Sequence, residues 1–222
     1  MEAGASNSAA NERRKIVLIG GGGHCKSVLD TLTVLGTYSD IFVTDEDVAV
    51  DLPFPGVKFA GSDDALPDLF RGGVREAFLS IGSIKSPRIR QQACGRARDI
   101  GFDFPSIIDP SACISSSASI GKGVFIGKGA IVNAGVRIGD FAIVNTGSII
   151  EHDCRVGEFA HVAVGAVVCG KADIGNDVFV GANATVIQGV KVGRKGVIGA
   201  GSVILRDVPE NGRAVGVWEG QG

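Results

Sequence analysis

The chain has 222 residues, of which 45% are hydrophobic, and its formal net charge is −2. This length allows one large domain or two small ones with an apolar core, and the charge argues against a protein that binds nucleic acid or anionic membranes. No apolar stretch approaches the roughly 18 residues of a membrane-spanning helix, so we expect no membrane insertion. The five cysteines form no CxxC pair, which suits a reducing, cytoplasmic compartment.

Residues 1–14 are polar and rich in alanine, serine and asparagine. They lack the apolar core of a secretory signal, and we expect a disordered lead-in. Residues 15–106 are predicted to form a small α/β domain. It begins with an apolar strand at residues 15–19, a run of four glycines at 20–23, and a helix over residues 25–35, where leucine and valine recur at helical spacing.

The glycine run is typical of a phosphate-binding turn, because backbone N–H groups at a helix start face an anion and glycine lets it come close. A second strand, at residues 41–43, ends at Thr44 and Asp45, and an acidic residue about 20 positions past the glycines can bond a ribose hydroxyl. The full dinucleotide fingerprint is absent, since Cys25 occupies the third glycine position. The segment therefore predicts half a Rossmann unit for a single nucleotide, with a plain tight turn as the alternative.

Two further elements complete the expected α/β domain. A third strand covers residues 74–81 and ends at Gly82 and Ser83, and a second helix covers residues 88–100.

A six-residue repeat begins at Ile114. Every sixth residue from there to Ile204 is isoleucine or valine, over 16 consecutive positions, and a small or short apolar residue lies two positions before each. Residues two apart on a strand point the same way, so each hexad places one branched and one small side chain inward. The glycine or asparagine that often follows the isoleucine or valine suits a sharp or left-handed corner.

Short strands joined by corners at this period are typical of a parallel β-helix. Three hexads per coil give about five coils over residues 114–204, and we expect the β-helix to span residues 107–208, with a C-terminal tail at 209–222. A β-sandwich is the alternative, but it predicts hairpin turns and variable spacing, which the sequence lacks. The spacing does not fix the handedness.

The only histidines are His24, His152 and His161. In the repeat, His161 lies one position before the inward Val162 and His152 lies in a corner, so both are expected outside the coils. His152 is followed by Asp153, and a carboxylate beside an imidazole suits a general base. A metal site is the alternative, but zinc needs a further ligand that the sequence does not provide, so we expect no metal.

Two cysteines are candidate nucleophiles. Cys154 occupies an inward small-residue position of the repeat and Cys25 lies at a helix start, so both are predicted to be buried packing residues.

Several motifs occur together in one order: GGGGHCK at residues 20–26, IGS at 81–83, IDPSA at 108–112, the hexads, and NT at 145–146 followed by EHDC at 151–154. In this combination the chain resembles the NeuD/PglD-type sugar acyltransferases over residues 15–208. The resemblance implies a nucleotide-binding α/β domain followed by a left-handed β-helix. It also implies a homotrimer with active sites between neighbouring prisms, and acetyl-CoA as cosubstrate.

The resemblance assigns roles to individual residues. His152 matches the family's general base, Asp153 the acid that orients it, and Gly170 a backbone N–H facing the thioester oxygen. The implied contacts to acetyl-CoA are His161, Gly170, Ala182 and Ala200, and those to the nucleotide-linked sugar are Gly22, Gly23, His24, Thr44, Asp45, Gly82, Ser83 and Asn145.

Many members of this family N-acetylate a 4-amino sugar attached to a nucleotide. The resemblance therefore implies an acetyl-CoA-dependent N-acetyltransferase in which the amine attacks directly, with His152 as base. Two alternatives remain open: O-acetylation of sialic acid or another sugar hydroxyl, and a non-catalytic nucleotide-binding scaffold. An NAD-dependent oxidoreductase is disfavoured by the missing third glycine.

Overall fold

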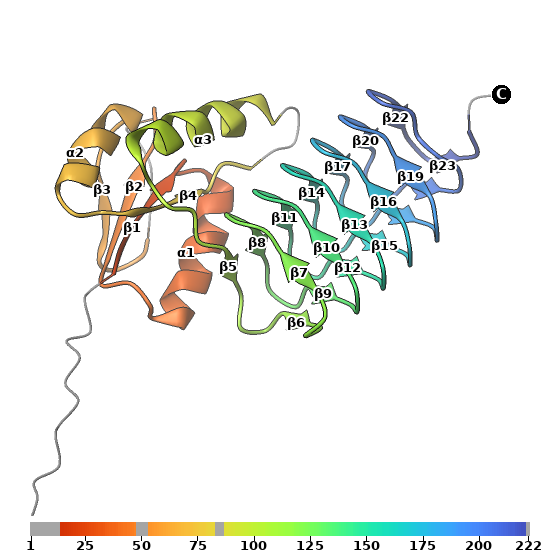
Figure 1. Ribbon diagram of the computed structural model, residues 1–222, viewed down its shortest axis with the longest axis horizontal. Helices are drawn as coiled ribbons and strands as arrows, with labels where there is room; N and C mark the ends of the chain where they lie inside the picture. The colour runs from red at the N-terminus through yellow and green to blue at the C-terminus, as the bar shows by residue number, and fades with distance from the viewer. Residues whose placement is uncertain (1–13, 48–52, 83–86, 221–222) are drawn as a thin grey trace, which may run out of the picture.

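The computed structural model describes residues 14–47, 53–82 and 87–220. They form a small α/β domain and a long stack of short strands that runs away from it toward the C-terminus (Figure 1). The predicted fold class, a half-Rossmann domain followed by a left-handed parallel β-helix, is confirmed. The predicted lead-in lies outside the described residues except for Arg14, which forms an ion pair with Glu76. No helix within the described stretches is long and apolar enough to cross a bilayer.

One parallel sheet, in the order β3-β2-β1-β4, forms the centre of the α/β domain. The strand predicted at residues 15–19 and the helix at 88–100 have the predicted bounds, and the first helix begins slightly earlier, at Gly23. The sequence pattern does not predict β3, η1 or α2. The elements are β1 (Lys15–Ile19), α1 (Gly23–Leu35), β2 (Asp40–Thr44), β3 (Val57–Phe59), the 3-10 turn η1 (Asp63–Ala65), α2 (Leu66–Arg71), β4 (Glu76–Leu79) and α3 (Arg88–Ile100).

Helices cover both faces of this sheet, which is why β1 is a continuous apolar run. Ile16 and Leu18 pack with α1, whereas Val17 and Ile19 pack with α2 and α3. Because the strands are parallel, their carboxyl ends meet at one edge of the sheet. The glycine turn after β1 therefore lies beside the ends of β2 and β4.

The remaining strands stack into a prism with three parallel sheets, which we call faces I, II and III. Each strand pairs with the strand of the same face in the next coil, and paired residues such as Ile143 and His161 lie 18 positions, or three hexads, apart. Face I consists of β5 (Ile107–Ile108), β8 (Phe125–Ile126), β11 (Ile143–Val144), β14 (His161–Val162), β17 (Phe179–Val180), β20 (Val197–Ile198) and β22 (Arg213–Ala214).

Face II consists of β6 (Cys113–Ile114), β9 (Ile131–Val132), β12 (Ile149–Ile150), β15 (Val167–Val168), β18 (Thr185–Val186), β21 (Val203–Ile204) and β23 (Val217–Trp218). Face III consists of β7 (Ser119–Ile120), β10 (Arg137–Ile138), β13 (Arg155–Val156), β16 (Asp173–Ile174) and β19 (Lys191–Val192).

The corners between faces form three edges of the prism. Edge I–II comprises residues 109–112, 127–130, 145–148, 163–166, 181–184 and 199–202; edge II–III comprises 115–118, 133–136, 151–154, 169–172, 187–190 and 205–208; edge III–I comprises 121–124, 139–142, 157–160, 175–178 and 193–196.

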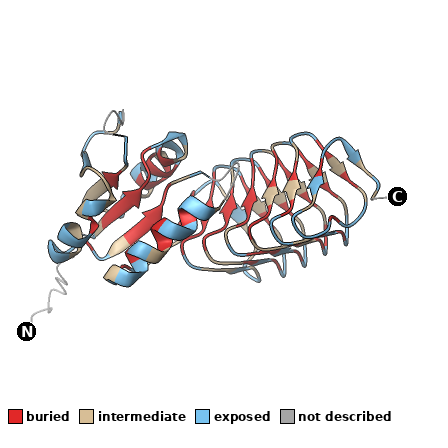
Figure 2. Cartoon of the chain, turned by 90° about the horizontal axis from the view of Figure 1, so that it is seen from above, coloured by how far each residue is buried: buried red, intermediate tan, exposed pale blue. Residues whose placement is uncertain are grey.

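The side chains that the hexads predict to point inward form the core of the prism. Val144, Ile150 and Val156, one from each face, are at most 1% exposed, and buried residues recur in every coil (Figure 2). Burying such a side chain contributes about 1.5–3 kcal/mol. Small residues such as Ala142 and Ser148 complete each face, so the core contains little aromatic volume.

The glycines that directly follow the inward isoleucine or valine are not left-handed, and that part of the corner prediction is wrong. The left-handed residue lies two positions further on, as at Gly147 (φ 65°) and Asp153 (φ 59°). Glycine is needed at the first corner position for space. At Gly157, a β-carbon would lie 2.5 Å from the backbone nitrogen of Asn176 in the next coil.

Two helices dock the α/β domain on the first coils of the prism. The apolar side of α1 packs on face I, where Phe125 joins its core. Along edge III–I, α3 makes two polar contacts: Arg90 Nη2 donates to the Phe141 carbonyl at 2.8 Å, and Gln91 Nε2 donates to Asp177 Oδ1 at 2.6 Å. This docking brings the glycine turn next to the β-helix.

The prism continues into the segment expected as a C-terminal tail. Strands β22 and β23 pair with β20 and β21, and Val208 bridges to Val192. The sequence spacing between neighbouring coils becomes shorter here. The Lys191 N–H donates to Asp207 Oδ1, which is 16 positions away instead of 18. Trp218 packs against the β-helix core at this end.

Candidate active site

A cavity of about 750 Å³ opens between the glycine turn and edge I–II. The α/β domain contributes the glycine turn, the start of α1 and the ends of β2 and β4, and the β-helix contributes edge I–II and β14. The cavity therefore joins predicted nucleotide contacts to two predicted β-helix residues, Asn145 and His161. Its lining comprises Gly20, Gly22, Gly23, His24, Ser27, Asp45, Ser80, Ile81, Gly82, Asn145, Thr146, His161 and Val164.

Asp45 fixes the glycine turn at the rim of this cavity. Its Oδ2 accepts a hydrogen bond from the Gly21 N–H at 2.5 Å, and its Oδ1 accepts one from the Asp47 N–H at 2.8 Å. Gly20 has φ 103°, and a β-carbon there would collide with Ile81. The turn thus has a fixed shape that depends on glycine.

The N-terminus of α1 opens into the cavity. Its N-cap residue, Gly22, has no side chain to cap the helix, and the first turn contains no acidic residue. A β-carbon at Gly22 or Gly23 would have no atom within 4 Å, so the main chain is open on this side. The N–H groups and the partial positive charge at such a helix end suit a phosphate.

His24 lies in the wall of the cavity as a neutral imidazole. Its ring packs edge-on against Phe125, with centroids 5.0 Å apart, and its Nε2 is buried without a hydrogen-bond partner among the described residues. Burial, with smaller contributions from the charge of Arg90 and from His161, lowers the pKa of His24 to about 3. His24 therefore contributes an uncharged ring to the cavity wall.

Besides Asp45, three predicted contacts follow or end β2 and β4, and their outcomes differ. Gly82 lines the cavity. The side chain of Thr44 is buried and turned away, with its Oγ1 donating to Asp63 Oδ1 at 2.8 Å, so the structure does not place Thr44 in the cavity. Ser83 lies outside the described residues.

Several residues of the cavity lining were not predicted from the sequence. Ser27 lies one helical turn after Gly23, and Thr146 directly follows Asn145, so helical spacing and adjacency could have identified both. Ser80 donates hydrogen bonds to the carbonyls of residues 19 and 20, at 3.1 and 2.5 Å, and no pattern in the sequence indicates this link between β4 and the turn.

His161 points out of the coils as predicted, yet it is only 6% exposed. It pairs with Ile143 and Phe179 on face I, and its ring lies edge-on to Phe179 with centroids 5.3 Å apart. The Nδ2 atom of Asn145 lies 3.4 Å from His161 Nε2. These two predicted residues form one pair in the cavity wall.

His152 and Asp153 form the expected pair on a different edge, edge II–III. The Nδ1–H of His152 donates to Asp153 Oδ2 at 3.0 Å, which leaves Nε2 available as a base. Both side chains are about half exposed in the single chain, at 50% and 59%.

Gly170 lies next to His152 in the following coil. The Lys171 N–H donates to the His152 carbonyl at 2.9 Å, whereas the Gly170 N–H donates no hydrogen bond within the described part of the chain. A main-chain N–H without a hydrogen-bond partner among the described residues therefore lies in the residue stacked against the imidazole.

The predicted catalytic residues and the predicted cofactor contacts Ala182 and Ala200 thus lie on two different edges with face II between them, and His161 lies on face I. His152 does not line the cavity. Edge II–III carries His152, Asp153 and Gly170, and edge I–II carries Asn145, Ala182 and Ala200.

The structure agrees with a packing role for the two candidate cysteines. Cys25 and Cys154 are fully buried and unpaired, and burial raises the pKa of each thiol to about 11. Across residues 14–47, 53–82 and 87–220, no three His, Cys, Asp or Glu side chains gather as a metal site would require.

Comparison with known families matches both halves of the chain. The PglD N-terminal domain matches residues 15–96, and the hexapeptide repeat of succinyl-transferase matches residues 117–152 and 171–206. No curated protein sequence gives a significant match.

Solved structures match nearly the whole chain. A histidine-to-alanine variant of GDP-perosamine N-acetyltransferase from Caulobacter crescentus, in complex with CoA and GDP-perosamine, is 39% identical, with a TM-score of 0.83 over 91% of this chain and 93% of the other. The acetyltransferase domain of PglB from Neisseria gonorrhoeae, in complex with acetyl coenzyme A, is 34% identical, with a TM-score of 0.85 over 92% and 97%. This extent of similarity, together with the matched N-terminal domain and repeat, shows that the chain is an acyltransferase and belongs to the NeuD/PglD-type sugar acyltransferase family.

Proposed function

We propose that this protein transfers the acetyl group of acetyl-CoA to the amino group of a nucleotide-linked 4-amino-4,6-dideoxy sugar. It acts as a homotrimer, in the cytoplasm, where reduced thiols such as its five unpaired cysteines persist. Two relatives support this choice of substrates: the Caulobacter protein is an N-acetyltransferase for GDP-perosamine, and the Neisseria domain is bound to acetyl coenzyme A.

The division of the site between two edges is the observation that carries the proposal. A general base must come within about 2.6–3.2 Å of the proton that it removes, and His152 is absent from the cavity that would hold the sugar. A second copy whose edge II–III faces edge I–II of the first would bring its His152 to that cavity. Three such copies close into a ring with identical contacts.

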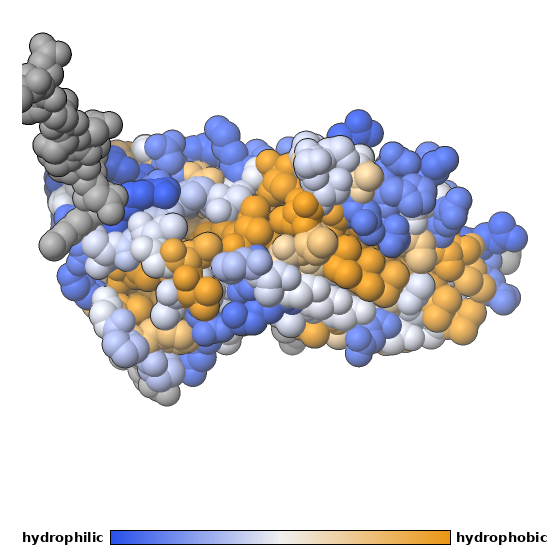
Figure 3. All heavy atoms as spheres, turned by 90° about the horizontal axis from the view of Figure 1, so that it is seen from below, coloured by the Kyte–Doolittle hydropathy of each residue, from blue (hydrophilic) through white to orange (hydrophobic). Residues whose placement is uncertain are grey.

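The outward side of face II has the composition of a protein interface. Its outward residues are largely apolar, and apolar surface runs along the underside of the β-helix (Figure 3). Face III is different, because Arg137, Arg155 and Lys191 point outward and are exposed. An apolar face between the two site-bearing edges supports packing against other copies. The apolar residues are Ile131, Ile149, Val167, Val203 and Val217.

The chemistry follows from the orientation of His152. Asp153 holds Nδ1–H, so Nε2 takes the proton of the sugar amine as the amine attacks the thioester carbonyl, a contribution of about 10²–10⁴ in rate. The C–S bond of the thioester then breaks, and CoA leaves as the free thiol. The Gly170 N–H donates to the thioester oxygen as negative charge develops there, a contribution of about 10²–10³. The amine attacks directly, because both substrates meet in one cleft and no covalent enzyme intermediate is needed.

Acetyl-CoA lies between the two facing edges in this proposal. Ala182 and Ala200 follow Thr146 and Val164 along edge I–II, in coils beyond the cavity. Their small side chains leave room for an extended pantetheine arm, and His161 is at the cavity end of this path. The acetyl group then reaches the cavity that holds the sugar.

A thiol-release assay with acetyl-CoA and UDP-, GDP- and dTDP-linked 4-amino-6-deoxy sugars tests the proposal. We expect thiol release with one of these sugars, and a loss of two to four orders of magnitude in kcat for His152→Ala, from the loss of the base. Faster turnover of a 4-hydroxy analogue would indicate O-acetylation instead. Nucleotide binding without any thiol release would contradict the proposal and favour the scaffold.

A further inference from the structure

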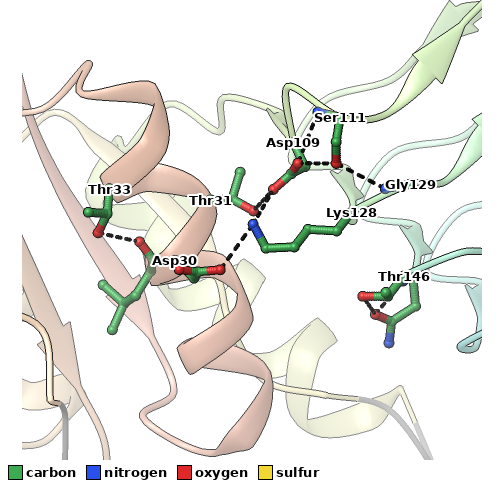
Figure 4. A network of polar contacts seen from close by, with 10 residues as sticks. Asp30, Thr31, Thr33, Asp109, Ser111, Lys128, Gly129 and Thr146 are labelled. Atoms are coloured by element: carbon green, nitrogen blue, oxygen red, sulfur yellow. Dashed lines mark hydrogen bonds and ion pairs between the residues drawn. The ribbon is translucent and has the colours of Figure 1, made fainter.

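A buried carboxylate links the α/β domain to the β-helix beside the cavity. Asp109, in the first corner of edge I–II, is 2% exposed, and Thr31, in the middle of α1, is fully buried. The Thr31 hydroxyl donates to Asp109 Oδ2 at 2.7 Å (Figure 4). Both the hydroxyl and the carboxylate depend on this contact, because water does not reach them.

The β-helix holds the Asp109 carboxylate from the other side. The Ser111 hydroxyl and N–H donate to Oδ1 at 2.6 and 3.0 Å, and Lys128 Nζ donates to Oδ2 at 3.1 Å. These hydrogen bonds hold the pKa of Asp109 well below its usual range although burial opposes them. Lys128 also contacts Asp30 of α1 at 3.0 Å, but both side chains are about half exposed, so this second link is weaker.

The linked elements are the ones that carry the two walls of the cavity. The start of α1 supplies Gly23 and His24 to one wall, and edge I–II supplies Asn145 and Thr146 to the other. The corner containing Lys128 stacks directly on the corner containing Asn145, since the Gly147 N–H donates to the Lys128 carbonyl at 2.8 Å. The contact between Thr31 and Asp109 therefore connects the elements that carry the two walls of the cavity.

We propose that Asp109 is a positioning residue for the acetyl transfer: through Thr31 it sets the distance between the start of α1 and edge I–II. The inference rests on the proposed function, in which α1 holds the nucleotide and the β-helix holds the acetyl donor. Asp109 touches neither substrate. It determines whether an amine held by the α/β domain reaches the thioester held by the β-helix.

Asp109→Asn and Thr31→Val separate positioning from binding. We expect kcat to fall about tenfold to a hundredfold in Asp109→Asn and less in Thr31→Val, because small misplacements of reacting groups have effects of this size. The KM for acetyl-CoA and the calorimetric Kd for GDP, UDP or dTDP should remain within a factor of about two, since the proposed nucleotide contacts lie in the α/β domain and the proposed acetyl-CoA contacts lie in the β-helix.

Thr33→Val is the matched control on the same helix. The Thr33 hydroxyl donates to the Leu29 carbonyl at 2.8 Å within α1 and forms no hydrogen bond to the described residues of the β-helix, so this variant should keep the kcat of the unmodified protein. An unchanged kcat in Asp109→Asn overturns the inference. Equal losses in all three variants, accompanied by equal losses in Tm, also overturn it in favour of general destabilisation.

Hydrogen exchange of α1 separates failure of this inference from failure of the proposed function. Absence of thiol release from the unmodified protein contradicts the proposed function alone. The positioning link still predicts faster backbone amide exchange in α1 for Asp109→Asn, with no change for Thr33→Val. Unchanged exchange in Asp109→Asn contradicts the link itself.

Discussion

The imidazole of His152 lies directly against the main chain of Gly170 in the next coil. A β-carbon on Gly170 would come within 2.6 Å of His152 Nε2 and 2.8 Å of its Cε1. The absence of a side chain at Gly170 therefore leaves the space that the imidazole occupies, next to the main chain of this residue. This arrangement lies on one edge of the prism, within one chain.

Gly170→Ala should reduce kcat about a hundredfold without unfolding the protein, because the new methyl group displaces the imidazole from its place. Steady-state kinetics and circular dichroism measure the two effects. Gly95→Ala is the control: it lies in α3, a β-carbon there meets no atom within 4 Å, and alanine should stabilise the helix by about 1 kcal/mol. Full activity of Gly170→Ala would show that the position of His152 does not matter for the reaction.

Mixed oligomers test whether His152 acts on the cavity of a neighbouring chain. His152→Ala removes the base on edge II–III, and Gly23→Trp fills the cavity, where the glycine has open space. Subunits of the two inactive variants, unfolded and refolded together in equal amounts, should recover about a quarter of the unmodified activity, because one interface in four then combines two intact edges. Activity no greater than that of the separate variants would place the whole site in one chain.

A charge on face II should prevent association of the chains. Val167→Glu places a carboxylate in the apolar column of this face, where burial without a partner costs several kcal/mol. We expect monomers by analytical ultracentrifugation and loss of thiol release. Lys191→Glu, on the exposed side of face III, should leave both the mass and the activity unchanged, and a Val167→Glu protein of unchanged mass would exclude face II from the interface.

His24 should make the protein less stable in mild acid. An unfolded histidine has a pKa near 6.5, whereas the pKa in the folded protein is about 3, so between these values the unfolded chain binds the additional proton. The contribution of His24 to the free energy of unfolding is complete above about pH 6.5. It decreases as the pH falls, by at most about 1.4 kcal/mol per pH unit. Urea unfolding at pH 7, 6 and 5 should show a steeper decrease for the unmodified protein than for His24→Asn. Equal slopes would show that His24 is readily protonated in the fold.

The β-helix could be predicted in detail because its rule is local and repeats. Each hexad contains its own inward pair, and strands from Cys113–Ile114 to Val203–Ile204 appear where the pattern places them. The pattern fails where the coils shorten, as at Arg213–Ala214. It also gives no help with β3 or α2, which have three and six residues and are too short for a periodic pattern to appear.

Several predicted site residues, among them His24, Asn145 and His161, line one cavity, but the arrangement of the site was not predicted. The hexad count assigns His152 and His161 to different parts of the coil, and this count could have predicted their separation. The orientation of the Thr44 side chain away from the cavity was not predictable, because its hydrogen-bond partner Asp63 belongs to η1, which the sequence pattern does not predict. The link between Thr31 and Asp109 spans 78 positions, and only the docking of the two domains reveals it.

The coil of three hexads has a consequence for how this protein can change length. Loss of 18 residues removes one whole coil, and every later side chain stays on the same face of the prism. This follows because residues 18 positions apart, such as Ile143 and His161, pair on one face. Loss of a single hexad instead shifts the frame by one face and would move all later residues of edge I–II to edge III–I. Natural variants and engineered forms of this enzyme should therefore differ by complete coils, and a coil lost or gained after Val164 leaves the residues that line the cavity unchanged.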